Sequence, residues 1–184
     1  SLFFDADGDG DQDLLTVIGG SENDLRDPIY TQRLYLNDGK ASYTEAKDAL
    51  PHLMTSAMRA AAADIDGDGD QDVYLGGRIT PAHYPFAPRS YLLENDGTGH
   101  FTDATQQRAP EAMGPGLVTA AVFVDVDADK QLDVIAEALP AVYWLKPVGR
   151  EALNWRATLV ATLPPTEHVN GQGYTLAQIV PGGP

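Results

Sequence analysis

Five aspartates occupy alternate positions of a nine-residue run, Asp64-Ile-Asp66-Gly-Asp68-Gly-Asp70-Gln-Asp72. In a β-strand all five side chains would lie on one face, where like charges about 4 Å apart repel by roughly 1 kcal/mol per pair even in water. A loop around a hard divalent cation accommodates them, because Ca²⁺ takes about six to eight oxygen ligands and the loop points alternate side chains inward. The run therefore predicts a calcium-binding loop that turns sharply at a glycine, Gly69.

The aspartate run occurs three times at nearly constant spacing. Its first aspartates, Asp5, Asp64 and Asp125, are separated by 59 and 61 positions, which indicates an internal repeat. A single run could be a solvated acidic loop, but three copies in register disfavour that interpretation. The candidate calcium ligands are Asp5, Asp7, Asp9, Asp11 and Asp13 in the first run, Asp64, Asp66, Asp68, Asp70 and Asp72 in the second, and Asp125, Asp127, Asp129, Gln131 and Asp133 in the third.

The ligand roles follow from the spacing within a run. In the second run we expect carboxylates from the first, second, third and fifth aspartates and a backbone carbonyl from Asp70. In the third run Ala128 and Lys130 replace the two glycines, and Lys130 brings a positive charge close to the site. We therefore expect two strong calcium sites and a third, weaker one.

An EF-hand does not fit these loops. It would need helices on both sides and a glutamate at the twelfth loop position, where this chain has Thr16, Leu75 and Ala136. Short apolar stretches flank each loop instead, and their length and β-branched content predict strands, although the alanine run is ambiguous. The expected strands before the loops are 2–4, 60–63 and 118–124, and those after them are 14–18, 73–75 and 134–136.

A second motif recurs after the first two loops. An apolar run, then Asn-Asp-Gly, then an aromatic residue and threonine occur at 34–44 and again at 91–102, and this order is typical of a β-hairpin. A weaker hairpin pattern spans 141–145 and 155–163. Four short antiparallel strands in a unit of about 60 residues fit one blade of a β-propeller.

These motifs resemble the FG-GAP/VCBS repeats of integrin-α-like β-propellers. The resemblance rests on the loops at 5–13 and 64–72 and on Asn-Asp-Gly-Thr-Gly-His-Phe-Thr-Asp-Ala-Thr at 95–105. Residues 64–127 look closest to bacterial VCBS proteins related to cartilage acidic protein. The resemblance implies a calcium-stabilised propeller whose loops carry recognition.

The expected fold is all-β, a partial β-propeller of about three four-stranded antiparallel blades with calcium loops between strands. We expect repeats at 1–57, 58–117 and 118–173, the third degenerate, and the start of a truncated fourth repeat at 174–184. Closed propellers have about four to eight blades. The chain therefore reads as part of a longer protein that supplies the remaining blades.

Composition excludes several classes of function. The net charge is −15, but the three loops hold 14 of the 27 acidic residues, and the other 13 nearly balance the 12 basic residues. Nothing in this distribution suits nucleic acid or an anionic membrane surface. The chain has no cysteine, which leaves no disulfide framework, zinc finger or thiol nucleophile and disfavours thrombospondin-type calcium repeats. Its longest apolar run, 117–124, is too short for membrane insertion.

Two functional hypotheses remain. The first is a non-enzymatic recognition or adhesion module that is extracellular, at the cell surface or periplasmic, and binds an unknown protein or carbohydrate through the loops 20–32 and 78–90. The second is the scaffold or sugar-binding part of a carbohydrate-active propeller enzyme.

Other candidate site residues give weaker signals. The four histidines show no paired-ligand spacing, and the sequence has no nucleophile elbow. A sugar or ligand pocket could involve Trp144, Trp155, Arg78, Arg89, Tyr84 and Tyr91, although packing and salt bridges between blades are the favoured explanation.

Overall fold

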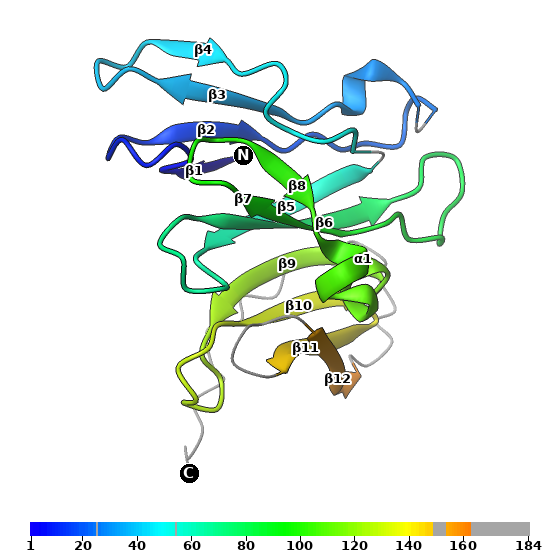
Figure 1. Ribbon diagram of the computed structural model, residues 1–184. Helices are drawn as coiled ribbons and strands as arrows, with labels where there is room; N and C mark the ends of the chain where they lie inside the picture. The colour runs from blue at the N-terminus through cyan, green and yellow to red at the C-terminus, as the bar shows by residue number, and fades with distance from the viewer. Residues whose placement is uncertain (25, 54, 149–153, 163–184) are drawn as a thin grey trace.

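The computed structural model describes residues 1–24, 26–53, 55–148 and 154–162, and these residues form β-sheet with little helix (Figure 1). Their twelve strands make three four-stranded sheets, in each of which consecutive strands pair antiparallel. Each sheet is therefore a simple meander within one stretch of chain. This confirms the predicted all-β fold, a partial β-propeller with three four-stranded blades.

The strand bounds place the acidic loops. The first sheet contains β1 (Leu2–Phe4), β2 (Asp13–Thr16), β3 (Arg33–Asn37) and β4 (Tyr43–Glu45). The second contains β5 (Ser56–Ala63), β6 (Asp72–Ile79), β7 (Tyr91–Asn95) and β8 (Phe101–Asp103). The third contains β9 (Leu117–Val124), β10 (Asp133–Leu139), β11 (Ala141–Val148) and β12 (Asn154–Thr162). Each acidic loop links the first strand of its sheet to the second, so the predicted strand–loop–strand unit is confirmed.

Short helical turns occupy only the connections. A 3₁₀ turn, η1 (Pro28–Tyr30), lies between β2 and β3, and α1 (Thr105–Arg108) and η2 (Pro110–Met113) follow β8. The predicted hairpins are confirmed as the pairs β3 with β4, β7 with β8, and β11 with β12. Residue 163 and the expected fourth repeat at 174–184 lie outside the described residues.

The alanine run before the second loop is a strand. Ala60 pairs with Leu75 and Ala62 with Val73 across β5 and β6. Alanine alone favours a helix, so the pairing to β6 and the packing of the sheet decide the conformation here.

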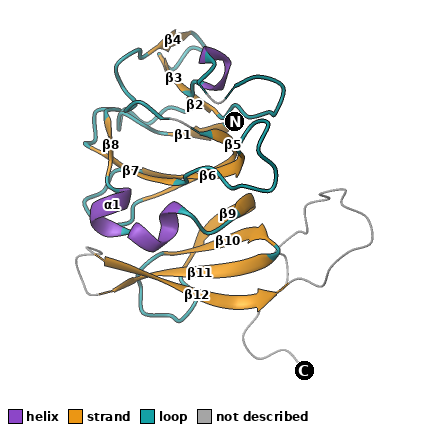
Figure 2. Ribbon diagram, turned by 90° about the vertical axis from the view of Figure 1, so that its right-hand side faces the viewer, coloured by secondary structure: helices purple, strands orange, loops and turns teal. Residues whose placement is uncertain are grey.

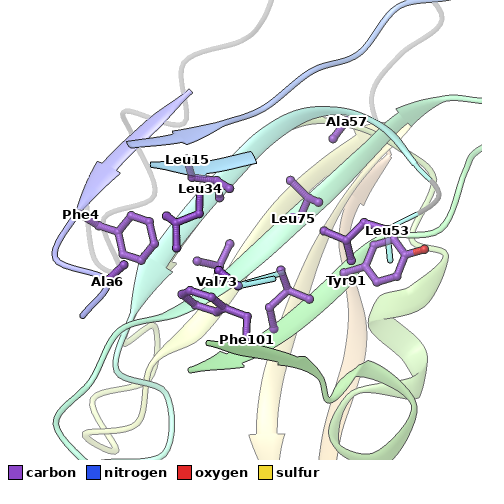
Figure 3. Close-up of a cluster of buried hydrophobic side chains, with 12 residues drawn as sticks. Phe4, Ala6, Leu15, Leu34, Leu53, Ala57, Val73, Leu75, Tyr91 and Phe101 are labelled. Carbon is purple, nitrogen blue, oxygen red and sulfur yellow. The ribbon is translucent and has the colours of Figure 1, made fainter. Parts of the chain in front are cut away.

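The first and second sheets pack face to face around an apolar core (Figure 3). Phe4, Leu15 and Leu34 come from the first sheet, and Val73 and Phe101 come from the second. The rings of Phe4 and Phe101 meet edge to face, with centroids 6.1 Å apart, as aromatic pairs prefer. This contact joins the first strand of one sheet to the last strand of the next.

The second and third sheets enclose another core. Tyr74 and Leu92 point away from the first sheet and cluster with Val134, Leu145 and Trp155 of the third. Figure 2 shows the order of the sheets, with α1 beside the second and third. The middle sheet is therefore covered on both faces, which is why six consecutive residues of β6, from Asp72 onward, are buried.

The second and third sheets approach closely at one glycine. A Cβ atom added to Gly76 of β6 would lie only 2.5 Å from Cγ1 of Val118 in β9. Real side-chain atoms do not come this near, so a larger residue at position 76 would push the two sheets apart.

Candidate metal centres

Each acidic loop ends on a buried aspartate. Asp13, Asp72 and Asp133 are the first residues of β2, β6 and β10, and their exposed fractions are 0%, 1% and 0%. A carboxylate is buried only when hydrogen bonds or cations compensate its lost hydration. Each of these side chains accepts a hydrogen bond from the backbone N–H seven residues earlier, at 2.7, 3.1 and 3.0 Å respectively.

The first aspartate of each run fixes the turn of its loop. Asp5 accepts hydrogen bonds from the backbone N–H groups of Gly8 and Gly10 at 2.9 and 3.1 Å. Asp64 holds Gly67 and Gly69 in the same way, at 2.7 and 3.2 Å. All four glycines have positive φ, between 76° and 101°, which glycine adopts without strain.

Three carboxylates of each run converge. The clusters are Asp5, Asp7 and Asp13; Asp64, Asp66 and Asp72; and Asp125, Asp127 and Asp133, each with oxygen atoms within 4.8 Å of one another. They are the first, third and ninth positions of the run. The middle aspartates Asp9, Asp68 and Asp129 instead accept hydrogen bonds from the backbone N–H two residues on.

At the seventh positions, side-chain oxygens of Asp11, Asp70 and Gln131 are buried without a hydrogen-bond partner among the described residues. These residues lie outside the three convergent clusters. The backbone carbonyl ligand expected from Asp70 stays a prediction.

Burial makes the second cluster unfavourable for uncompensated charge. Desolvation raises the pKa of Asp72 from 3.8 to about 7, although Asn95 and Ile65 donate hydrogen bonds to it. Desolvation and the neighbouring Asp68 raise the pKa of Asp70 to about 6. A cation among these carboxylates would favour their charged forms and reverse both effects.

The donor set fits a hard divalent cation. Every candidate ligand is an oxygen, and within the described residues Oδ1 of Asp11 and Oδ1 of Asp66 are buried without a hydrogen-bond partner. The second oxygen of Asp66 accepts a hydrogen bond from Arg108 at 3.1 Å. Such a partner orients a ligating carboxylate while leaving its other oxygen free for a metal.

Asn95 connects the second loop to the first. Its backbone N–H donates to Asp72 at 2.9 Å, and its side-chain amide donates to the carbonyl of Ala6, in the first loop, at 2.8 Å. The backbone N–H of Asp5 in turn donates to the side chain of Gln71 at 3.2 Å. Ligands of adjacent sites are therefore joined by hydrogen bonds between two sheets.

The third loop keeps the shape of the other two without their glycines. Ala128 and Lys130 have φ of 62° and 70°, and Asp125 accepts from the N–H groups of Asp129 and Lys130 at 3.1 and 2.9 Å. A basic side chain from a neighbouring strand, Lys146 of β11, contacts this loop, which also contains Lys130. The Lys146 ammonium group bonds Asp127 and lies 2.8 Å from Oδ2 of Asp129.

The other candidate residues pack or face solvent. Trp155 is in the second core, and Trp144 is half-buried with its ring 5.6 Å from the Lys146 ammonium. Arg89 forms a 2.7 Å ion pair with Asp103 and stacks over Tyr91, whereas Tyr84 is exposed. Among the histidines, His100 lies in a hairpin turn beside Thr98, His52 and His83 are exposed, and His168 lies outside the described residues.

The sequence did not reveal the residue that links the first two loops or the basic residues that pair with the loop carboxylates. Asn95 appeared only as part of a turn signal, and Arg108 and Lys146 did not appear as partners of the loops. The one sequence clue to Asn95 is that an asparagine precedes Asp-Gly in both hairpins, at 37 and 95.

Stacked four-stranded meanders, each with an acidic loop between its first two strands, are the arrangement of a β-propeller whose blades are sequence repeats. The sequence model of the FG-GAP-like repeat matches residues 5–75, from the first loop through the second. Over that region the chain is similar to FG-GAP-like repeats. No curated protein matches the sequence.

A solved structure shares the fold. It is a lectin of Agrocybe aegerita described as recognising non-reducing terminal N-acetylglucosamine, with 17% sequence identity and a TM-score of 0.51. The match covers 88% of this chain but 37% of the lectin. The chain thus spans little more than a third of the lectin's length.

Replacing Asn95 by alanine tests the bridge between the first two loops. The change removes two side-chain hydrogen bonds and leaves the buried carbonyl of Ala6 without that partner, so we expect a loss of about 1–3 kcal/mol in the free energy of unfolding. Urea denaturation measures it. Asn37→Ala is the matched control, because the Asn37 side chain bonds Gln12 and Asp38 within the first sheet at exposed sites, and we expect a change within about 0.5 kcal/mol. Equal losses would contradict the bridge.

The raised pKa of Asp72 predicts a pH dependence of the metal-free protein. Between the unfolded pKa of 3.8 and the folded value of about 7, the native state holds a proton that the unfolded state releases. The contribution of Asp72 to stability is therefore present at low pH and lost as the pH rises through about 7. Denaturation in metal-free buffer at several pH values between these limits measures it. Asp72→Asn should reduce the slope of the free energy of unfolding against pH in this range. An unchanged slope would contradict the attribution of this pH dependence to Asp72.

Proposed function

We propose that this chain is a calcium-binding segment of a β-propeller that acts as a recognition or adhesion module, without catalysis of its own. The observation that carries the proposal is the threefold convergence of carboxylates at equivalent loops. Within the described residues, all three loops also contain buried side-chain oxygens without a hydrogen-bond partner, among them Oδ1 of Asp11, Oδ1 of Asp66 and Oε1 of Gln131. The carboxylates would hold the ion, which would neutralise their repulsion and brace the strands on either side.

Calcium suits these ligands better than other common ions. The clusters offer only carboxylate oxygens, which disfavours zinc, since zinc sites in proteins draw largely on cysteine and histidine. Magnesium demands near-ideal octahedral geometry, whereas calcium accepts variable coordination from flexible loops.

The recognition surface in this proposal lies at the opposite ends of the strands. Because each sheet is a meander, the acidic loops and the Asn-Asp-Gly turns share one end, and the connections from the second to the third strand lie at the other (Figure 1). Those connections expose Ile29, Tyr84 and Phe86, with exposed fractions of 53%, 62% and 69%. Exposed large apolar side chains on loops are typical of binding surfaces.

The proposed location is extracellular, at the cell surface or periplasmic. Extracellular calcium modules work with dissociation constants of about 10⁻⁴–10⁻³ M, which suits solvent-exposed loops of this kind. The described part of the chain contains no helix with the length and hydropathy that a membrane crossing requires.

The alternative is the scaffold or sugar-binding part of a carbohydrate-active propeller enzyme. The similar lectin, whose description names a sugar ligand, supports a carbohydrate as one ligand class to test. Detection of glycan cleavage by the parent protein would favour the enzyme.

Calcium is expected to stabilise the chain. At a free concentration 100 times Kd, one site adds about 2.7 kcal/mol, and for a chain of this size each kcal/mol raises Tm by roughly 2–4 °C. Thermal unfolding with calcium should therefore shift by roughly 5–10 °C per occupied site, and EGTA should reverse the shift.

Variants rank the loops in the same assay. Asp66→Ala or Asp68→Ala should remove most of the calcium-dependent Tm increase that the second loop contributes. Asp127→Ala should reduce the Tm increase by a smaller amount. Equal losses from the second and third loops would contradict this ranking, and no calcium effect in the unmodified chain would contradict the proposed function.

The exposed aromatic residues provide a test of recognition. If Tyr84 and Phe86 contact a glycan, the double variant Tyr84→Ser/Phe86→Ser should lose binding on a printed glycan array while its calcium-dependent Tm shift stays the same. The distance of these loops from the acidic loops is the reason for expecting two separate effects. Unchanged array binding by the double variant would place recognition elsewhere.

A further inference from the structure

The third acidic loop differs from the others in charge rather than in shape. Its backbone follows the same turn, with positive φ at Ala128 and Lys130, and Asp125 accepts two backbone hydrogen bonds as Asp5 and Asp64 do. A non-glycine residue in this conformation carries a cost in backbone strain. Some interaction in the folded loop must offset that cost.

Lys146 supplies an attractive interaction, because its ammonium group contacts carboxylates of the loop. Its ammonium group bridges the carboxylates of Asp127 and Asp129, with Nζ 2.8 Å from Oδ2 of Asp129. Its hydrogen bonds to the two carboxylates raise the pKa of Lys146, and its side chain lowers the pKa of Asp129. Lys146 is therefore bonded to Asp127, one of the three carboxylates that the third cluster would offer to calcium.

The strand register shows that the position of Lys146 is special. Leu145 pairs with Val134 in the third sheet as Leu93 pairs with Val73 in the second, so Lys146 is equivalent to Glu94. Glu94 is an acid that pairs with Arg108, whose other contact is one oxygen of Asp66. In the first sheet the equivalent residue is Leu36, which has no charge.

The three loops consequently carry different charge. In the second loop Arg108 contacts both Glu94 and Asp66, and the charge of Glu94 offsets that of Arg108, so the net charge stays that of the five aspartates. The third loop has four aspartates and includes Lys130, and the Lys146 ammonium group contacts two of its carboxylates. A divalent ion would therefore meet a weaker attraction and would have to displace the bridge from Lys146.

We propose that the Lys146 ammonium is the resident cation of the third loop, so that this chain binds two divalent ions, at the first and second loops. The inference rests on the proposed calcium binding. It replaces the expectation of a third, weaker site with a loop that is closed by its own side chain.

Calcium stoichiometry tests the proposal. Isothermal titration of the 184-residue chain should give two ions, and Lys146→Met, which frees both carboxylates, should give three. Lys146→Arg retains the charge and should give two. Lys130→Met removes an equal charge from the same loop but leaves the bridge intact, and it should also give two.

A second readout isolates the third loop. Trp144 lies beside Lys146, so a terbium ion bound in this loop would be sensitised when tryptophan is excited. The unmodified chain should give little such emission and Lys146→Met should give a strong signal that excess calcium removes. The measurement on the unmodified chain remains decisive even if the variant does not fold.

The outcomes separate the two proposals. Three ions in the unmodified chain, two ions in Lys146→Met, or strong tryptophan-sensitised emission from the unmodified chain would overturn the role of Lys146. Binding of no calcium by any of these proteins would overturn the proposed function itself.

Discussion

The buried carboxylate at the start of each second strand is the constraint on which the rest of the site depends. Asp72 accepts hydrogen bonds from the backbone of Ile65 in its own loop and of Asn95 at the end of the third strand. Asp13 makes the same pair of contacts with Ala6 and Asn37. One side chain therefore ties together the acidic loop, the strand that it begins and the neighbouring hairpin. A metal at this carboxylate would act on all three at once.

Much of the fold and the site could be predicted because the signals are local. A loop that must wrap a cation needs oxygen donors at fixed spacing, so the sequence predicted carboxylates at the first, third, fifth and ninth positions, and those at the first, third and ninth converge. Short apolar stretches on either side, followed by Asn-Asp-Gly turns, likewise predicted the strands and hairpins. What these signals share is that each depends on residues within about one loop or turn.

The partners that come from other strands could not be predicted in this way. Asn95 reaches Ala6 across 89 positions, and Arg108 reaches Asp66 across 42. Lys146 reaches Asp127 only because the register of β11 against β10 brings it there. Such contacts require the strand pairing to be known first and, for Asn95, the stacking of the sheets as well. The same is true of the alanine strand, whose own preference is helical and whose conformation is set by its neighbours.

The close approach at Gly76 bears on the geometry of a complete propeller. The hydrogen atom of Gly76 opposite Val118 lets the second and third sheets come closer together than any larger side chain would allow. In a ring of stacked sheets the spacing of neighbouring sheets contributes to the angle between them, and that angle to the number of blades that close the ring.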